Sequence, residues 1–401
     1  MNSLPTLSRT NAVLPPSFPS PTKGEGIGNE KSLVNAKVAK REGIDVRFSL
    51  FLPPPLRGRI KEGGPVKRAK RVLWPVIGFF VFIVIGSPYE GNAAEKLTGL
   101  YSARVMSQSM PWIAQEAGLF QKYNLDFQLV FIASSGMATA ALLGGDVEVT
   151  LTGGVGIVRA FIQGNTDVVF IGSVKNVMTQ SIVGGGNIKR PEDLKGKRIG
   201  VSRIGGNTHY FTIQALRRYG LDPGRDFTFI QTGGDPEAFA ALVSNNIDAA
   251  TVTAPTDAQA LAHGFRYIVY GPDLRIPYAA TAFVTRRTVM AKRPQAIAQF
   301  MRVMAEASKI LHTDKELIYK VMAKQLRITD KSVMDAAYNA EIKALEPRLV
   351  IKSEALQAIL EEVSKTDARA NRIKPQELVD TRYLDEMEKS GFFDKIWGGK
   401  R

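Results

Sequence analysis

A pattern that occurs twice constrains the fold of this chain more than any other feature. The segment AALLGGDVEV at 140–149 has a counterpart, AALVSNNIDA, at 240–249, and apolar runs follow at 169–172 and 268–271. Each copy reads as helix, turn, strand, helix and strand, which is the unit of a parallel sheet covered by helices. We therefore predict an α/β fold with two similar lobes. Chance similarity between two generic α/β units is the alternative.

The formal net charge of +15 is of the kind that nucleic-acid-binding proteins carry. Residues 1–93 contribute +8 of this charge, and the much longer remainder contributes only +7. No zinc-finger, RNP or arginine-rich motif accompanies the basic residues. We therefore expect a mildly basic globular surface and no nucleic-acid partner.

Cysteine is absent from the sequence, and histidine occurs only at positions 209, 263 and 312. A chain without cysteine forms no disulfide, uses no thiolate nucleophile and holds no metal through sulfur. The histidines do not have the spacing of a metal-binding pair. We therefore expect no metal site and no cofactor. We also identify no catalytic residue, because no triad or pair of carboxylates stands out.

The first 66 residues are rich in proline, glycine and serine and show little apolar periodicity. Such a composition cannot bury enough apolar surface to form a core. We predict that residues 1–66 are disordered, or are a spurious extension translated from a start codon placed too early. A proline-rich docking tail is the alternative.

Residues 67–94 have the pattern of a signal peptide. The basic cluster KRAKR at 67–71 precedes an uncharged apolar run at 72–86, and small residues follow at 91–94. The apolar run is shorter than the roughly 20 residues of a membrane-spanning helix. We predict export to the periplasm with cleavage after Ala93 or Ala94, and an uncleaved membrane anchor is the alternative.

In lobe one, predicted strands end in short polar turns that lead into predicted helices. The carboxyl ends of parallel strands share one edge of a sheet, and ligands bind in the crevice there. Helix N-termini behind these turns favour an anionic or hydrogen-bond-accepting group, although helix capping alone also explains Ser, Thr and Gly at such positions. The residues of lobe one that we predict to bind a ligand are Ser107, Gln108, Ser134, Ser135, Thr152 and Gly153.

Lobe two offers equivalent turns. A strand that ends at Val201 leads through a glycine loop into a helix, and this loop matches neither a P-loop nor a dinucleotide-binding fingerprint. The loop suits an anion, because backbone N–H groups and the helix dipole converge there. The predicted ligand-binding residues of lobe two are Ser202, Gly206, Asn207, Thr208, Thr232 and Asp235, and Tyr278 is added from the strand that follows.

The turns and repeats also divide the exported part of the chain. We assign residues 95–183 to the first part of lobe one and residues 184–275 to lobe two, with the boundary at a run of glycines. Residues 276–401 return to lobe one and end in amphipathic helices. The apolar residues of these helices are interpreted as packing positions.

Several runs resemble a known family. They are GLF at 118–120, EDLKGKRIGV at 192–201 and VDTRYL at 379–384. Residues 97–290 resemble the periplasmic solute-binding proteins of ABC importers, in the group that binds alkanesulfonates, taurine, nitrate or thiamine-pyrimidine precursors. The resemblance implies a type II periplasmic binding fold, in which two lobes joined by two crossover strands close on a solute. It also implies a small-molecule solute and a membrane permease as partners, and we expect a monomer.

Three functions remain open from the sequence. The first is capture of a solute for import. The second is an enzyme like the thiamine-pyrimidine synthases, which share this fold but resemble cytosolic proteins with a cysteine-rich motif and a reactive histidine. This chain has no cysteine and carries an export signal, although its own His209 could serve as a base. The third is a membrane-tethered sensory domain. The sequence does not identify the ligand: Arg104 and Arg203 could pair with an anion, whereas Trp112, Tyr210 and Tyr278 could stack on a ring.

Overall fold

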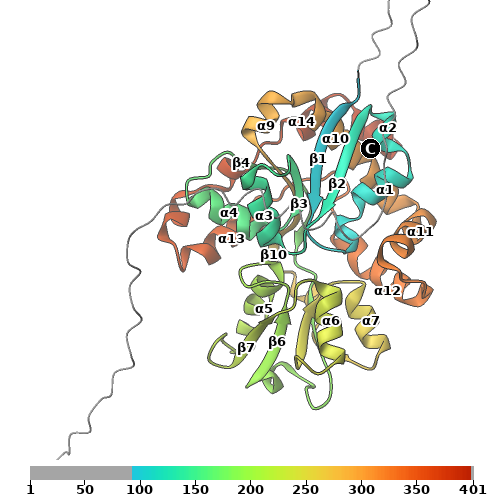
Figure 1. Cartoon of the computed structure of the whole chain (residues 1–401). Helices are drawn as coiled ribbons and strands as arrows, with labels where there is room; N and C mark the ends of the chain where they lie inside the picture. The colour runs from blue at the N-terminus through green and yellow to red at the C-terminus, as the bar shows by residue number, and fades with distance from the viewer. Residues whose placement is uncertain (1–92, 399–401) are drawn as a thin grey trace, which may run out of the picture. The chain divides into compact units, whose positions relative to one another are not determined.

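The computed structural model describes residues 93–398, which form two β-sheets with helices packed around them (Figure 1). The predictions for residues 1–66 and for the signal peptide lie outside this range, except that Ala93 and Ala94 are described as irregular chain. Among residues 93–398, no helix combines the length and the apolar character needed to cross a membrane.

The first sheet has five strands in the order β2-β1-β3-β10-β4. Strand β1 pairs in parallel with β2 and β3, whereas β10 runs antiparallel between β3 and β4. We call the part of the chain built on this sheet lobe one. The strands are β1 (Glu95–Tyr101), β2 (Leu125–Phe131), β3 (Val149–Thr152), β4 (Val168–Val177) and β10 (Pro277–Arg286).

The second sheet has the same arrangement, with the order β7-β6-β8-β5-β9. Strand β6 pairs in parallel with β7 and β8, and β5 runs antiparallel between β8 and β9. We call the part built on this sheet lobe two. The strands are β5 (Ser181–Gly184), β6 (Lys197–Val201), β7 (Phe227–Gln231), β8 (Ala249–Val252) and β9 (Arg266–Val269).

The two copies of the repeat occupy equivalent places in the two sheets. In the first sheet Gly99 of β1 pairs with Val149 of β3, and in the second Ile199 of β6 pairs with Ala249 of β8. The repeated segments therefore form the same helix-to-strand unit in each lobe, because the same spacing of apolar residues and turns buries the same faces. The predicted α/β class is confirmed.

The chain passes between the sheets twice. It leaves β4 at Val177 and enters β5 at Ser181, and it returns between Val269 of β9 and Pro277 of β10. The sequence placed the first passage at the glycines 184–186, because a glycine run resembles a junction. In the structure residues 181–183 already belong to the second sheet, since their backbone groups pair with β8 and β9.

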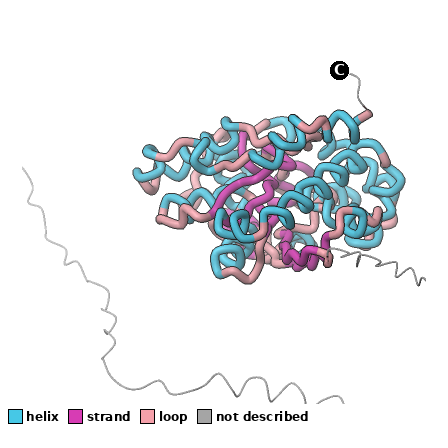
Figure 2. The backbone as a smooth tube through the Cα atoms, turned by 90° about the horizontal axis from the view of Figure 1, so that it is seen from above, coloured by secondary structure: helices cyan, strands magenta, loops and turns pink. Residues whose placement is uncertain are grey.

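Helices cover both faces of the first sheet, as the view from above shows (Figure 2). One face packs against α1 and the long helix α10, and the other face packs against α3, α4 and α13. In lobe one and the C-terminal region the helices are α1 (Met110–Glu116), α2 (Leu119–Lys122), α3 (Ser135–Gly144), α4 (Gly154–Ile162), α9 (Arg287–Lys292), α10 (Pro294–Thr313), α11 (Lys315–Leu326), α12 (Lys331–Glu341), α13 (Ser353–Ser364), α14 (Arg382–Lys389) and α15 (Phe392–Trp397).

Helices of lobe two also reach lobe one. Helix α5 shares an apolar cluster with α13 and β10, and α7 packs against α12. The lobes are thus in contact on both sides of the passage between them. The helices of lobe two are α5 (Asn207–Arg217), α6 (Asp235–Val243), α7 (Thr256–Ala262) and α8 (Gly271–Leu274), and short 3-10 turns lie at Met106–Gln108, Pro191–Leu194, Ile342–Ala344, Ala368–Arg372 and Pro375–Leu378.

Candidate functional site

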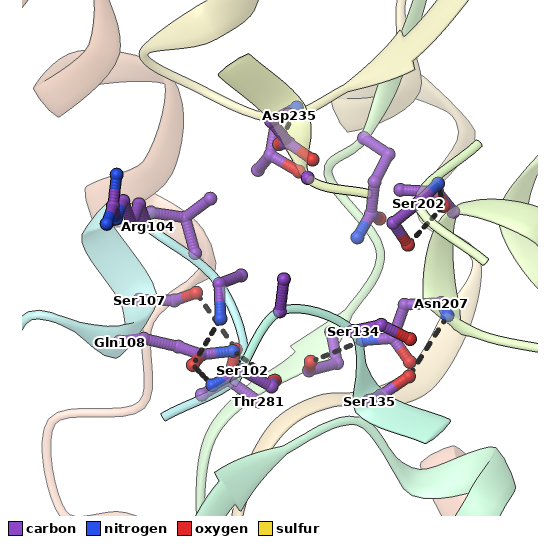
Figure 3. Close-up of a pocket in the computed structure, with 18 of the residues that line it drawn as sticks. Ser102, Arg104, Ser107, Gln108, Ser134, Ser135, Ser202, Asn207, Asp235 and Thr281 are labelled. Atoms are coloured by element: carbon purple, nitrogen blue, oxygen red, sulfur yellow. Dashed lines mark hydrogen bonds between the residues drawn. The ribbon is translucent and has the colours of Figure 1, made fainter. Parts of the chain in front are cut away.

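A cavity that opens to solvent lies between the two lobes (Figure 3). Its wall is made mostly by the segments that follow β1, β2, β6, β7 and β8, together with part of β10. These are the carboxyl ends of the parallel strands of both sheets, where α/β proteins bind ligands. The geometry therefore concentrates polar side chains from distant parts of the chain around one space.

A network of hydrogen bonds shapes the wall that follows β1. Gln108 is buried, and its Oε1 accepts hydrogen bonds from the backbone N–H groups of Ser102 at 2.7 Å and Ala103 at 3.0 Å. Its Nε2 donates to the Ser102 hydroxyl at 3.1 Å, and the hydroxyls of Ser107 and Thr281 lie 2.9 Å apart. Gln108 thus holds the loop in place, because most of its bonding capacity is used within the protein.

The end of β2 and the start of α3 form the next part of the wall. Ser134 adopts a positive φ of 85° as the N-cap residue of α3. The residue is only 7% exposed, yet its Oγ has no hydrogen-bond partner among the described residues. A buried hydroxyl without a partner is unfavourable unless a ligand or water satisfies it. Ser134 is therefore a candidate donor to a bound molecule, beside the first N–H groups of a helix.

Three residues of lobe two line the cavity after β6, namely Ser202, Asn207 and Thr208. The Oγ1 atom of Thr208 accepts a hydrogen bond from the backbone N–H of Ser202 at 2.8 Å and lies 2.9 Å from the Ser202 hydroxyl. This pair fixes the loop that leads into α5. Thr208 therefore has a structural role in the loop as well as a place in the cavity wall.

Asp235 begins α6 and faces lobe one across the cavity (Figure 3). Its Oδ2 accepts a hydrogen bond from the backbone N–H of Thr253 at 2.8 Å. Burial raises the pKa of Asp235 to about 6, and the hydrogen bond from Thr253 opposes part of this rise. The Asp235 carboxyl is therefore harder to ionise than an exposed aspartate, and a cationic group bound in the cavity would favour its charged form.

Residues near the first passage between the sheets close the back of the cavity. Lys175 is buried, and its Nζ donates to Oε2 of Glu341 at 2.8 Å and to the Thr179 hydroxyl at 2.6 Å. Gln180 is 6% exposed, and its Oε1 has no hydrogen-bond partner among the described residues. The lysine is thus neutralised within the protein, whereas Gln180 offers an unused acceptor.

Arg104 contributes an exposed positive charge to the cavity wall. Its guanidinium carbon lies 4.6 Å from the centre of the Phe131 ring, and both residues line the cavity. A cation over an aromatic face is held in place without losing its charge. Arg104 is therefore positioned to attract an anionic group. Arg203, the other arginine considered from the sequence, is not part of the lining.

Most of the predicted site residues line this cavity. The structure places eight of them in its wall, from both lobes. They are Ser107, Gln108, Ser134, Ser135, Ser202, Asn207, Thr208 and Asp235.

The other predicted residues do not line the cavity. Thr152 is fully buried beneath α3, and its hydroxyl lies 3.5 Å from the carbonyl oxygen of Ser135. The Thr232 hydroxyl donates to the carbonyl of Val201 at 3.2 Å, and Gly206 is the N-cap residue of α5. Gly153 and Tyr278 instead contact Asn207 across the lobes. Gly153, Gly206 and Thr232 follow strands as predicted, whereas Thr152 and Tyr278 lie within β3 and β10, and none of the five is in the cavity wall.

Several lining residues were not predicted from the sequence. Thr253 follows β8 as Gly153 follows β3, so the repeat itself could have indicated it. Lys175, Gln180 and Thr281 lie in or beside the strands near the passages, where no motif marks them. Their place in the wall depends on how the two sheets meet. The lining of this cavity contains no histidine.

The described residues contain no group of three or more His, Cys, Asp or Glu side chains placed to hold a metal ion. His209 lies outside the cavity, with its ring 4.5 Å from the ring of Phe229. Burial, and then the charge of Arg159, lower the pKa of His209. The polar side chains of the cavity wall are therefore hydroxyls, amides, carboxylates, Arg104 and the paired Lys175.

Comparison with known proteins identifies similar sequences. Residues 109–316, about half of the chain, match the family described as NMT1/THI5 like. A protein of Brucella abortus (strain 2308), described as a candidate binding protein, is 26% identical over 248 residues, which cover 60% of this chain and 75% of that protein. The taurine-binding periplasmic protein of Escherichia coli (strain K12) is 29% identical over 177 residues, which cover 42% of this chain and 52% of that protein.

Solved structures share the fold. The alkanesulfonate-binding protein SsuA from Xanthomonas axonopodis pv. citri, bound to MOPS, aligns with a TM-score of 0.59 at 20% identity, over 72% of this chain and 97% of SsuA. The desulfurization enzyme DSZB aligns with a TM-score of 0.56 at 15% identity, over 74% of this chain and 99% of the enzyme. The predicted periplasmic binding fold is confirmed, and the resemblance noted from the sequence is supported by the matching family and relatives. The chain belongs to the NMT1/THI5-like family.

Proposed function

We propose that this protein is the solute-binding component of an ABC importer, which captures a small molecule between its lobes and delivers it to a membrane permease. The observation that carries the proposal is a polar cavity whose wall comes from the strand ends of both lobes. A solute in such a cavity contacts both lobes, and therefore stabilises the form in which they are close together. The periplasmic taurine-binding relative and the fold shared with SsuA support this function.

The chemistry of the cavity favours a solute with two different ends. On lobe one, the unpartnered Ser134 hydroxyl at the start of α3 and the guanidinium of Arg104 suit an anionic or hydrogen-bond-accepting group. Across the cavity, the Asp235 carboxylate and the unpartnered Oε1 of Gln180 suit a hydrogen-bond donor such as an ammonium group. An aminosulfonate such as taurine satisfies both ends, whereas nitrate offers no donor.

Binding without turnover is the expected activity, although DSZB shows that an enzyme can use this fold. The serines that line the cavity have no histidine beside them in the wall, and His209 lies outside it. A serine needs an adjacent base to act as a nucleophile. We therefore favour a binding protein over an enzyme of the thiamine-pyrimidine-synthase type.

The export signal at residues 67–94 belongs to the same proposal, since an importer's binding protein must reach the periplasm. Solute-binding proteins of this kind meet the permease from outside the membrane. We propose that the cleaved protein acts there as a monomer.

A thermal-shift and calorimetric comparison tests the function. Purified protein is mixed with taurine, a simple alkanesulfonate without an amine, nitrate and an aminopyrimidine. A ligand at 100 times its dissociation constant stabilises the folded state by about 2.7 kcal/mol. Taurine is expected to give the largest shift, and the amine-free sulfonate a smaller one. No shift with any of the four would refute solute binding as proposed, and a preference for nitrate would refute the two-ended ligand.

A further inference from the structure

The side chain of Asn207 crosses from lobe two into lobe one. It stands at the start of α5, and its Nδ2 donates to the carbonyl oxygen of Ala280 in β10 at 3.0 Å. Its Oδ1 accepts a hydrogen bond from the hydroxyl of Tyr278 at 2.7 Å. Its backbone N–H donates to the Ser135 hydroxyl at 3.3 Å. The amide group is therefore used in contacts between the lobes.

Tyr278 is held rigidly to receive this side chain. It is fully buried, and its hydroxyl accepts a hydrogen bond from the backbone N–H of Val155 at 3.0 Å while it donates to Asn207. Its ring lies 4.6 Å from the ring of Tyr210, which is on α5. Val155 and Tyr278 both belong to lobe one, so the hydroxyl that binds Asn207 is oriented by lobe one, and the ring of Tyr210 adds a contact from lobe two.

Gly153 provides the space that Asn207 fills. A Cβ atom built on Gly153 would lie 1.8 Å from Oδ1 of Asn207, far inside van der Waals contact. The backbone of Gly153 has φ −86° and ψ 156°, which any residue adopts without strain. The backbone therefore does not demand glycine here. The absence of a side chain is explained by the amide that enters from the other lobe.

We propose that Asn207 is a latch that holds the lobes closed by docking into a socket formed by Gly153, Tyr278 and the carbonyl of Ala280. Asn207 then acts on affinity through closure, and its amide is not the main ligand contact. The rest of α5 supports this docking. The Tyr210 hydroxyl donates to the carbonyl of Ala358 at 3.3 Å, and Arg217 pairs with Glu362 at 2.7 Å.

The latch makes a quantitative prediction for the protein without ligand. Loss of two hydrogen bonds between the lobes should lower the ratio of closed to open molecules about 5- to 140-fold. Apparent ligand affinity falls with the closed fraction, since only the closed form offers both walls. This consequence for affinity rests on the proposed function, but the conformational effect does not.

Distance measurement between the lobes tests the latch in the absence of any ligand. The sequence has no cysteine, so cysteines introduced at the exposed positions Gln163 in lobe one and Val243 in lobe two carry the only spin labels. We expect a closed population in the unsubstituted protein. Asn207→Ala and Gly153→Ala should each shift the distribution toward open molecules. Gly136→Ala is the matched control, because a Cβ there meets only the Ser134 hydroxyl at an ordinary 3.8 Å.

The double variant separates a latch from general damage to the fold. Once Asn207 is alanine, a methyl group at position 153 has free space, so Gly153→Ala should add little opening to Asn207→Ala. Melting curves of every variant report folding independently. The proposal is overturned if the unsubstituted protein has no closed population, if Asn207→Ala leaves the distances unchanged, or if the two substitutions open the lobes additively. Failure to bind taurine would refute the proposed ligand and leave this result standing.

Discussion

Replacement of Glu341 by glutamine should destabilise the protein far more than any exposed charge substitution. Glu341 ends α12, and its carboxylate meets the ammonium of Lys175 at 2.8 Å, with the two side chains 1% and 2% exposed. The carboxylate also bonds to the hydroxyl of Thr179. Glutamine keeps the shape of the side chain but removes the charge. The ammonium of Lys175 is then left buried without a counter-ion.

The magnitude follows from the burial of the pair. Removal of one partner from a buried ion pair costs about 3–5 kcal/mol, because the remaining charge cannot return to water. Total stabilities of folded domains are about 5–15 kcal/mol, so this loss is a large part of the whole. With a urea m-value of about 3 kcal/mol per M, the unfolding midpoint should fall by about 1–2 M.

Urea unfolding followed by circular dichroism measures this shift. Glu386→Gln is the matched control, because Glu386 pairs with Arg302 at 2.5 Å but is 53% exposed, and such pairs contribute less than about 1 kcal/mol. The double variant Lys175→Met with Glu341→Leu should recover much of the loss, since apolar side chains replace a buried ion pair at little cost. The buried pair does not have this role if Glu341→Gln costs no more than the control, or if the double variant is as unstable as the single one.

Three further results are expected. Burial raises the pKa of Asp235 to about 6, above the ordinary value of 3.8, so protonation of Asp235 stabilises the folded state fully below about pH 4 and this contribution is lost as pH rises through 6. Asp235→Asn should therefore reduce the decline in unfolding free energy between pH 4 and pH 7. An unchanged profile would contradict the assigned pKa. Intact-mass analysis of protein recovered from the periplasm should show an N-terminus at Ala94 or Glu95, whereas membrane-bound protein that retains residues 67–93 would favour an anchor. Taurine incubated with the protein and followed by mass spectrometry should be recovered intact, and appearance of a product would establish an enzyme.

Much of the fold could be predicted because it depends on local patterns. The repeat at 140–149 and 240–249 predicted two equivalent units, and the pairing of Gly99 with Val149 and of Ile199 with Ala249 shows them in register. The alternation of apolar runs with polar turns indicates which segments are buried. This pattern can be read from each segment without knowledge of the rest of the fold. The first passage between the sheets was placed too late, because the short strand Ser181–Gly184 carries no signal that distinguishes it from the strand before it.

The turns of the candidate site were predicted for the same reason. Polar residues after strands Glu95–Tyr101 and Leu125–Phe131 reach the cavity because parallel strands bring their carboxyl ends to one edge. The direction of each side chain was not predictable in this way. Tyr278 and Thr152 follow or lie in the expected strands, but their side chains are packed inside the protein.

The sequence by itself determined the two-lobed α/β class, the family and the segments that reach the cavity, since these depend on periodicity, turn residues and local motifs. Only the tertiary structure decided that Asn207 docks against Gly153, that Lys175 is neutralised by Glu341, and that Gln180 faces the cavity with an unused acceptor. Each of these relations joins segments that are far apart in the chain. Their energies depend on distance and burial, which exist only after the two sheets have been brought together.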